Sequence, residues 1–340
     1  MSTVSVAPAS RGLFHEDPPF GKVLVIAGPT ASGKTAISLM LSKQWEGEFV
    51  SADSMQIYRG MDIGTAKATP AEQAEVPHHM LDLLEPGENY SVSSYVEDAV
   101  PVCNALLSRG KLPVITGGTG LYIDALLAGR QFAGVSGGDA ALREELAREY
   151  DQLGGEAMLQ RLAEADPERA LKLAPTDRRR IIRALEVYRL TGRTISDHDA
   201  VSQTVPPAYE ALYVVLDYSD RAALYSRIED RVDRMCREGL FEEAQRLLAL
   251  GVPDSSTCMQ AIGYRQAVMA LRGEITREEA VALIKQSTRR YAKRQMTWFR
   301  RRQDALRLSP DRMTMKEMAE RVYEVFQSET GAAQPSSNTF

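Results

Sequence analysis

Residues 28–35 read Gly28-Pro29-Thr30-Ala31-Ser32-Gly33-Lys34-Thr35, which is a complete G-x-x-x-x-G-K-[ST] phosphate-binding loop. An apolar run at 23–27 precedes it, and residues 35–44 have the pattern of a helix. In this context the glycines let backbone N–H groups surround phosphate oxygens at the helix N-terminus. We expect Lys34 to reach the terminal phosphate and Thr35 to bind a Mg²⁺ ion. The stretch therefore predicts a ligand with two or more phosphates, which need not be a nucleotide.

Apolar runs at 49–52, 112–116 and 211–216 continue the pattern, with helical periodicity between them. This alternation predicts an α/β fold, a P-loop NTPase-like parallel sheet flanked by helices. A short strand is expected near 305–308. Helices are expected at 220–237, 241–250, 259–271, 277–302 and 314–327.

Strand signals stop between 133 and 205, where helices are expected at 140–150, 156–165 and 178–191. We predict a helical insertion domain at 133–205, inside an α/β core formed by 21–132 and 206–328. Residues 1–20 have neither a signal core nor transit-peptide character, so we interpret them as a flexible extension. The small, polar residues 329–340 are expected to form a disordered tail.

The composition is that of a soluble protein: 340 residues, 44% hydrophobic and 26% charged. No apolar run approaches the roughly 20 residues that cross a bilayer, so no membrane association is expected. The three cysteines are isolated and odd in number, which favours a reducing, cytoplasmic location. Adjacent His78 and His79 make a poor chelate, and we expect them to form structural hydrogen bonds.

The net charge is −5, yet cations cluster in two places. Residues 285–302 hold eight cations and no acid, unlike an ordinary solvated helix, which mixes signs. A second cluster consists of Arg178, Arg179, Arg180 and Arg183. Local basic patches on an acidic protein suggest a polyanion bound at a defined place.

Two more groups follow predicted strands, at the edge where ligands bind in such sheets. Asp53 follows the run at 49–52, and Gly117-Gly118-Thr119-Gly120 follows the run at 112–116. From its position alone, Asp53 is a turn cap, an indirect Mg²⁺ ligand or a catalytic group. Thr119 could donate a hydrogen bond to a phosphate or to a leaving group, although a tight turn explains its glycines equally well.

Together these motifs closely resemble the tRNA dimethylallyltransferase (tRNA isopentenyltransferase) family over about residues 22–308. The resemblance rests on Gly28–Thr35, Asp53–Tyr58, Asp62–Lys67, Pro77–Asp82, Tyr90–Val92, Gly117–Tyr122, Gln260–Tyr264 and Lys293–Arg300. Met80 departs from the usual leucine. The zinc-finger tail of eukaryotic members is absent, so the chain looks like a bacterial type.

The resemblance implies that the N6 amine of adenine 37, beside the tRNA anticodon, attacks C1 of dimethylallyl diphosphate and that diphosphate leaves. In this reaction Asp53 is the general base and Thr119 contacts the leaving-group oxygen. The P-loop residues, Mg²⁺, Arg221 and Arg227 would hold the diphosphate. Arg221 and Arg227 are six residues apart, so they share a ligand only if Arg221 lies at an irregular helix start.

The same resemblance implies tRNA contacts. The target base must be flipped out of the anticodon loop, at a cost of a few kcal/mol. Ser54 and Gln56, next to Asp53, are expected to hold the edge of the flipped adenine, and Asp53 and Met55 are also expected to contact the tRNA. Expected anticodon-loop contacts are Gln260, Ala261, Ile262, Gly263, Tyr264 and Arg265. The residues of the basic segment that are expected to contact the phosphate backbone are Lys293, Arg294, Arg300 and Arg289. Expected contacts from the insertion are Arg178, Arg179, Arg180, Ile181, Ile182 and Arg183. We expect Trp298 and Phe299 to pack.

Three alternatives remain open at this point. A nucleotide kinase would use the P-loop for ATP, but it would also need an acceptor site and an arginine lid. An adenylate dimethylallyltransferase would prenylate free AMP, ADP or ATP. A non-enzymatic RNA-binding module would leave the three strand-end motifs unexplained. We favour the tRNA enzyme and expect a monomer.

Overall fold

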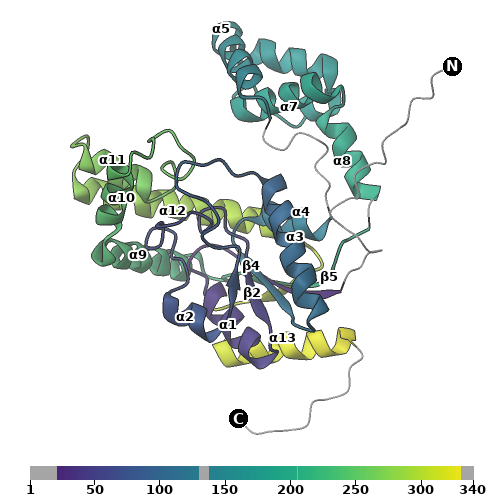
Figure 1. The fold of residues 1–340 in the computed structure, drawn as a ribbon, viewed down its shortest axis with the longest axis vertical. Helices are drawn as coiled ribbons and strands as arrows, with labels where there is room; N and C mark the ends of the chain where they lie inside the picture. Colours follow the sequence, from purple (N-terminus) through teal and green to yellow (C-terminus); the bar gives the residue numbers. More distant parts are fainter. Residues whose placement is uncertain (1–20, 130–137, 205, 331–340) are drawn as a thin grey trace, which may run out of the picture. The chain divides into compact units, whose positions relative to one another are not determined.

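The structure, a computed structural model, describes residues 21–129, 138–204 and 206–330. The chain divides into two compact units (Figure 1). Among the described residues, the α/β unit comprises 21–89, 98–124 and 209–330, and the helical unit comprises 90–97 and 125–208. The helical unit is thus somewhat larger than the predicted insertion at 133–205. The predicted extension 1–20 and most of the predicted tail, 331–340, lie outside the described residues.

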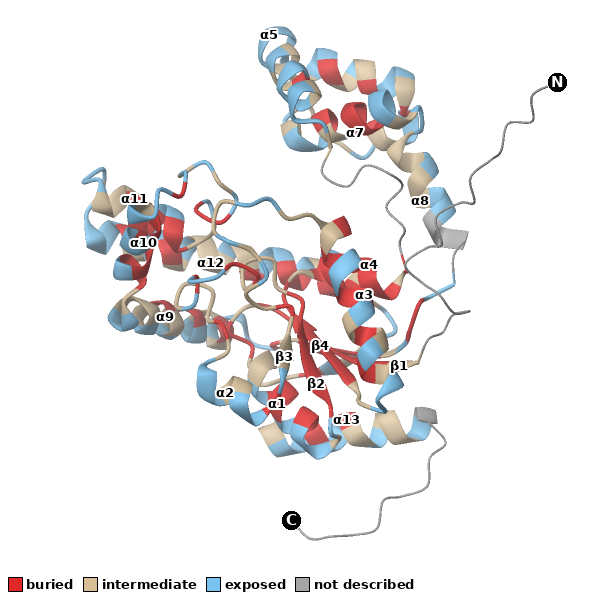
Figure 2. Cartoon of the chain, viewed as in Figure 1, coloured by how far each residue is buried: buried red, intermediate tan, exposed pale blue. Residues whose placement is uncertain are grey.

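A parallel sheet forms the centre of the α/β unit. Within the described residues its order is β3-β2-β4-β1-β5-β6. The bounds are β1 (Lys22–Ala27), β2 (Glu48–Ser51), β3 (His78–His79), β4 (Pro113–Gly117), β5 (Glu210–Leu216) and β6 (Leu306–Leu308). Residues 23–27 of β1 are fully buried, and Figure 2 shows buried residues concentrated along the strands. An unbroken apolar run suits such a strand because helices cover both faces of a parallel sheet.

Helices pack on this sheet and beside it. The bounds are α1 (Lys34–Gln44), α2 (Pro70–Glu75), α3 (Val92–Ser108), α4 (Gly120–Leu127), α9 (Arg221–Glu238), α10 (Leu240–Ala249), α11 (Tyr264–Leu271), α12 (Arg277–Phe299) and α13 (Met315–Thr330). α1 and α13 contribute Ile37, Leu41 and Val322 to one core with the strands. α9 and α12 bury Ile228 and Met296 in a second core that includes Ala31 of the P-loop.

The helical unit has its own core. Its further helices are α5 (Ala140–Ala165), α6 (Pro167–Ala170), α7 (Arg178–Thr191) and α8 (Ile195–Thr204). α5 and α7 pack against each other through Leu146, Met158 and Leu185. α5 kinks at Gly154, whose φ of 82° lies in the left-handed region that glycine adopts readily.

Most predicted elements are present, and the differences have local causes. The helix expected at 259–271 begins only at Tyr264, because residues 256–263 form turns and Gly263 has φ 101°. α12 ends at Phe299 instead of 302. α13 continues to Thr330, into the segment predicted to be disordered. β3 was not predicted, since it has only two residues and is defined by its pairing with β2. No helix of the described residues is long and apolar enough to cross a membrane.

Candidate active site

Three sequence-predicted elements meet at one edge of the sheet. β2, β4 and β1 are neighbours, and their carboxyl ends lead into Asp53, Thr119 and the P-loop. A Cβ atom on Gly117 would lie 2.1 Å from the Ala52 carbonyl oxygen, so only glycine permits this approach. The Thr119 N–H donates to the Ala52 carbonyl at 3.1 Å, and the Ser54 N–H donates to Thr119 Oγ1 at 3.1 Å. The segments that carry Asp53 and Thr119 are therefore bonded directly to each other.

Asp53 is oriented by its own turn. Its Oδ1 atom accepts the Met55 N–H at 2.9 Å. Its charge acts on the pKa values of three neighbours, Lys34, Arg231 and Tyr291. Asp53 is thus the acid around which the other polar groups of this edge are arranged.

The P-loop has the expected conformation for binding an anion. Gly33, at the N-cap of α1, has φ 94°, which lets the loop turn into the helix. Lys34 Nζ donates to the Pro29 carbonyl at 2.7 Å. Burial and the neighbouring Arg231 lower the pKa of Lys34 to about 7, although Asp53 opposes the shift. The buried Ser32 hydroxyl has no hydrogen-bond partner in the described structure. A phosphate group would satisfy these donors.

A cavity of about 750 Å³ opens beside the P-loop. One side presents the start of α1, with Thr35 among the lining residues. Another side is the face of α9 that carries Arg227, Arg231 and Arg234. Arg227 Nε also donates to the Ala31 carbonyl at 3.1 Å. The predicted partner Arg221 is exposed at the first position of α9 and is not among the lining residues.

Arg231 and Arg234 line the cavity, and neither was among the candidate site residues predicted from the sequence. Burial lowers the pKa of Arg231 and Asp53 opposes that shift, so this guanidinium lies close to the reacting edge. The signal was present in the sequence, because positions 227, 231 and 234 recur at helical spacing and share one face. Arg221 does not share that face, which agrees with the doubt raised by its six-residue spacing from Arg227.

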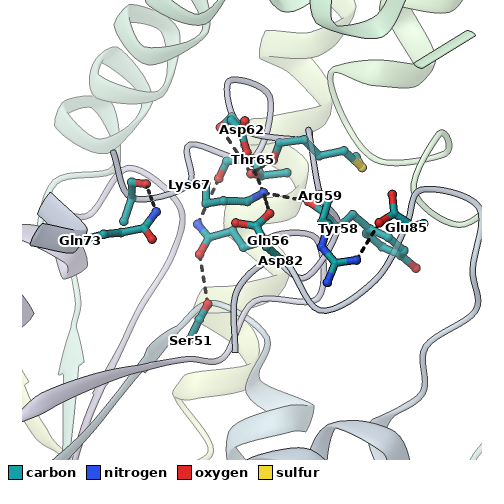
Figure 3. A network of polar contacts seen from close by, with 12 residues as sticks. Ser51, Gln56, Tyr58, Arg59, Asp62, Thr65, Lys67, Gln73, Asp82 and Glu85 are labelled. Atoms are coloured by element: carbon teal, nitrogen blue, oxygen red, sulfur yellow. Dashed lines mark hydrogen bonds and ion pairs between the residues drawn. The ribbon is translucent and has the colours of Figure 1, made fainter. Parts of the chain in front are cut away.

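Residues of the loop at 62–67 line a further side of the cavity, and Figure 3 shows the polar contacts of this loop. Lys67 is 8% exposed and donates to the Tyr58 carbonyl at 2.8 Å, to Asp62 at 2.7 Å and to Asp82 at 2.6 Å. Its ammonium thus has three acceptors, and two of them, the Tyr58 carbonyl and Asp82, connect the loop to the rest of the unit. These contacts between protein groups hold the loop in place.

Gln56 contacts the same loop. Its Nε2 atom donates to the carbonyls of Thr65 and Ala66, each at 3.3 Å, and its Oε1 atom accepts the Ser51 hydroxyl at 3.0 Å (Figure 3). The prediction was that Gln56 would hold an adenine edge. In this structure its amide is engaged by protein groups on both sides, so Gln56 supports the cavity wall.

A buried carboxylate joins this wall to α10 and α11. Glu243, 1% exposed, accepts the N–H groups of Asp62, Ile63 and Gly64, each at 3.0 Å, and the Tyr264 hydroxyl at 2.5 Å. Tyr264 is therefore fully buried, which corrects the prediction that its side chain contacts the anticodon loop.

The other members of the 260–265 segment differ in exposure. Gly263 is buried, and Ala261 and Ile262 are half-buried. Gln260 and Arg265 are exposed. Only these two present whole side chains at the surface, so they remain the members of this segment that are available to a partner.

The basic segment 285–302 also needs a correction. Lys285 pairs with Asp233 at 2.7 Å, and Arg289 pairs with Glu229. These acids belong to α9, so the absence of acids within the segment does not mean that its cations are unpaired. Lys293, Arg294 and Arg300 are exposed. Arg294 lies over the Tyr291 ring, 5.5 Å from its centroid.

The arginines of the helical unit are engaged in a similar way. Arg178 pairs with Asp151 at 2.8 Å, Arg180 with Asp177 at 3.8 Å and Arg183 with Glu186 at 2.8 Å. Arg179 is exposed.

Ile181 and Ile182, which we predicted to contact tRNA, are 0% and 5% exposed in the core of the unit. This burial corrects the prediction for both isoleucines, whose side chains stabilise the helical unit.

The structural roles expected for two residue pairs are confirmed. His78 Nδ1 bonds the Val76 carbonyl, and His79 Nε2 bonds Glu48, each at 2.7 Å. Within the described residues no three His, Cys, Asp or Glu side chains converge as a metal site. Trp298 Nε1 donates to Asp124 at 2.8 Å, and Phe299 is buried.

Comparison with known proteins identifies the family of the chain. The family model described as IPP transferase matches residues 56–302, and the model described as Isopentenyl transferase matches residues 21–82. The chain is 47% identical over 279 residues to the tRNA dimethylallyltransferase of Pelotomaculum thermopropionicum, covering 82% of this chain and 88% of that protein. It is 46% identical over 280 residues to the protein of the same name from Carboxydothermus hydrogenoformans, covering 82% and 89%.

Solved structures of proteins from the same family are also similar to this chain. The tRNA isopentenylpyrophosphate transferase of Staphylococcus epidermidis is 38% identical with a TM-score of 0.67, covering 91% of this chain and 99% of that one. A eukaryotic dimethylallyltransferase acting on tRNA is 26% identical with a TM-score of 0.78, covering 93% and 81%. With a family model spanning most of its length and such relatives, this chain belongs to the IPP transferase family.

Proposed function

We propose that the protein transfers the dimethylallyl group of dimethylallyl diphosphate to N6 of adenine 37 in the tRNA anticodon loop. The bond between N6 and C1 forms as the bond between C1 and the bridging oxygen breaks. The N6 proton passes to Asp53, and diphosphate leaves. A tRNA substrate would place the reaction in the cytoplasm.

The observation that carries this proposal is the hydrogen-bonded pair of segments bearing Asp53 and Thr119, located beside the P-loop and a cavity lined by arginines. An exocyclic amine becomes acidic as its bond to carbon forms, and a carboxylate can then accept the proton. The departing diphosphate gains charge, which Lys34, Arg227 and Arg231 would stabilise. Relatives that bear the name tRNA dimethylallyltransferase support the choice of substrates.

The residues of the cavity fit a Mg²⁺ ion bound together with the diphosphate. The Thr35 side chain lines the cavity, and the Ser32 hydroxyl is buried without a protein partner. No three acids converge as a metal site within the described residues, and Mg²⁺ commonly uses few protein ligands together with phosphate oxygens and water. The bound ion would supply positive charge to the leaving diphosphate. The protein would contribute Thr35 and the arrangement of the loop.

Exposed cations support a proposal for where the tRNA backbone binds. Lys293, Arg294 and Arg300 of the basic segment are exposed, and so are Arg265 and Arg179. The first four belong to the same unit as the cavity. We propose that these side chains contact phosphates and that the protein acts as a monomer.

The test is a transfer assay with labelled dimethylallyl diphosphate and Mg²⁺. An anticodon stem-loop and free AMP are offered separately, and labelled ATP is the control for kinase activity. We expect label in the stem-loop only. Transfer to AMP at an equal rate would favour an adenylate dimethylallyltransferase, and phosphoryl transfer from ATP would favour a kinase.

Asp53→Asn tests the role of the base in the same assay. The variant should lose turnover and retain binding of both substrates, because the amide keeps the shape of the carboxylate but accepts no proton. The exposed Asp98→Asn is the matched control. Turnover by Asp53→Asn at the wild-type rate would eliminate Asp53 as the base.

A further inference from the structure

Gln295 lies between the two glycine-rich loops of the site. It belongs to α12 and is 5% exposed. Its Oε1 atom accepts the Thr30 N–H of the P-loop at 2.9 Å, and its Nε2 atom donates to the Gly118 carbonyl at 2.9 Å. One side-chain amide thus joins the loop after β1 to the loop after β4. The Thr30 N–H is used for this contact and not for a phosphate.

The contact is tight on both sides. A Cβ atom at Gly118 would lie 2.2 Å from Gln295 Nε2, so the second loop approaches the amide as closely as glycine allows. Gln295 is followed by Met296, which is buried in the core shared by α9, α12 and Ala31 of the P-loop. The amide is therefore attached to a rigid element that also packs against the P-loop.

A second side chain of α12, that of Tyr291, lies near Gln295 and Thr119. Tyr291 lies one helical turn before Gln295; burial raises the pKa of its hydroxyl, and the neighbouring side chains of Thr119 and Gln295 oppose that rise. Thr119 in turn accepts the Ser54 N–H, beside Asp53. Gln295 thus connects the P-loop to Gly118, the residue before Thr119, and Thr119 is hydrogen-bonded to the segment that carries Asp53.

We propose that Gln295 is a positioning residue for prenyl transfer, holding the P-loop and the 117–120 loop at a fixed separation. The inference rests on the proposed function, in which the P-loop holds the diphosphate and Thr119 contacts its bridging oxygen. Both loops must act on one substrate at the same moment. A change of about 1 Å in their separation would cost about 10²-fold in the chemical step.

Gln295→Glu is the informative variant because its effect depends on pH. The protonated carboxyl reproduces the amide, with a carbonyl that accepts from Thr30 and an O–H that donates to Gly118. The ionised carboxylate places a second acceptor against the Gly118 carbonyl and breaks the bridge. Burial raises the pKa of such a carboxyl, so we expect the carboxyl introduced at position 295 to ionise within the pH range of the assay.

The experiment measures the single-turnover rate at saturating dimethylallyl diphosphate and stem-loop, well below the melting temperature of each variant. At about pH 8.5 we expect Gln295→Glu to be about 10²-fold slower than wild type, with less than about tenfold change in diphosphate affinity. The ratio of variant to wild-type rate should rise as the pH falls to about 6, as the carboxyl protonates. The exposed Gln245→Glu, on α10, is the matched control and should show neither effect.

Gly118→Ala perturbs the same contact from the other loop and should slow the same step, without the pH dependence. A Gln295→Glu variant that is folded and within twofold of the wild-type rate at about pH 8.5 would overturn the inference. So would a rate ratio that does not change with pH. If Gln295→Glu does not fold, a wild-type rate in Gly118→Ala would overturn it. A wild-type protein that transfers no prenyl group to the stem-loop would overturn the proposed function and, with it, this inference.

Discussion

Removal of the Glu243 carboxylate should loosen the wall of the cavity. This group accepts three backbone N–H groups of the 62–64 segment and the Tyr264 hydroxyl. A hydrogen bond to a charged acceptor contributes about 1.5–3 kcal/mol. Adding four such values would overestimate the loss, because the segment is partly exposed and water can reach its freed N–H groups. Allowing for this, we predict that Glu243→Ala lowers the free energy of unfolding by about 3–5 kcal/mol.

Urea unfolding followed by tryptophan fluorescence measures this change. Both tryptophans, Trp45 and Trp298, belong to the α/β unit. Glu242→Ala is the matched control, since Glu242 is the preceding residue in the same first turn of α10 and forms an exposed ion pair with Arg277. Its effect should stay within about 1 kcal/mol.

A double-mutant cycle tests the contacts themselves. Tyr264→Phe removes one hydrogen bond to the carboxylate and should cost about 1–3 kcal/mol in the wild type. In the Glu243→Ala background the same change should cost little, which gives a coupling of about 1 kcal/mol or more. Additive effects, or a Glu243→Ala variant as stable as the Glu242→Ala control, would refute the reasoning.

Other predictions follow from the arginines and from a buried acid. Arg231→Met should raise KM for dimethylallyl diphosphate about tenfold or more, because Arg231 lines the cavity. Arg221→Met should change this KM less than about twofold. Equal effects of the two variants would contradict the assignment of Arg231 to the diphosphate site. Replacing Lys293 and Arg294 with alanine should reduce the salt dependence of stem-loop binding by up to about two phosphate contacts, and an unchanged slope would exclude phosphate contact there. Burial opposes ionisation of Glu186, but hydrogen bonds from two arginines overcome it and lower the pKa of the carboxyl. The ionised Glu186 should therefore stabilise the fold above about pH 4.5, and this stabilisation should be lost as the pH falls through the lowered pKa. The free energy of unfolding of Glu186→Gln should depend less on pH in this range than that of the wild type. Parallel acid-unfolding curves for the two proteins would refute the prediction.

The elements that the sequence predicted well are those specified by local pattern. The P-loop is recognisable because its glycines, lysine and threonine have fixed spacing between an apolar run and a helix. Asp53 and Thr119 were predictable as neighbours because the carboxyl ends of parallel strands share one edge. Neither inference needed to know which side chains meet across the fold.

The errors come from contacts between residues far apart in the sequence. Lys285 and Arg289 looked unpaired because their acids, Asp233 and Glu229, lie on another helix. Gln295 and Gly118 are separated by 177 positions, so no spacing rule could join them. Family motifs also include buried residues: Ile181 and Tyr264 stabilise the protein from within, and their presence in a motif does not show that they touch a substrate.

The helical face of Arg227, Arg231 and Arg234 is a different case. Its spacing is visible in the sequence, and only the choice of Arg221 as partner obscured it.

The most direct test of the central claim is mass analysis of an anticodon stem-loop after incubation with the protein, dimethylallyl diphosphate and Mg²⁺. We predict the replacement of one hydrogen by one dimethylallyl group, mapped by nuclease digestion to adenine 37. A matched stem-loop with guanine at that position should stay unmodified. An unmodified adenine stem-loop, or a prenyl group mapped to another nucleotide, would contradict the account.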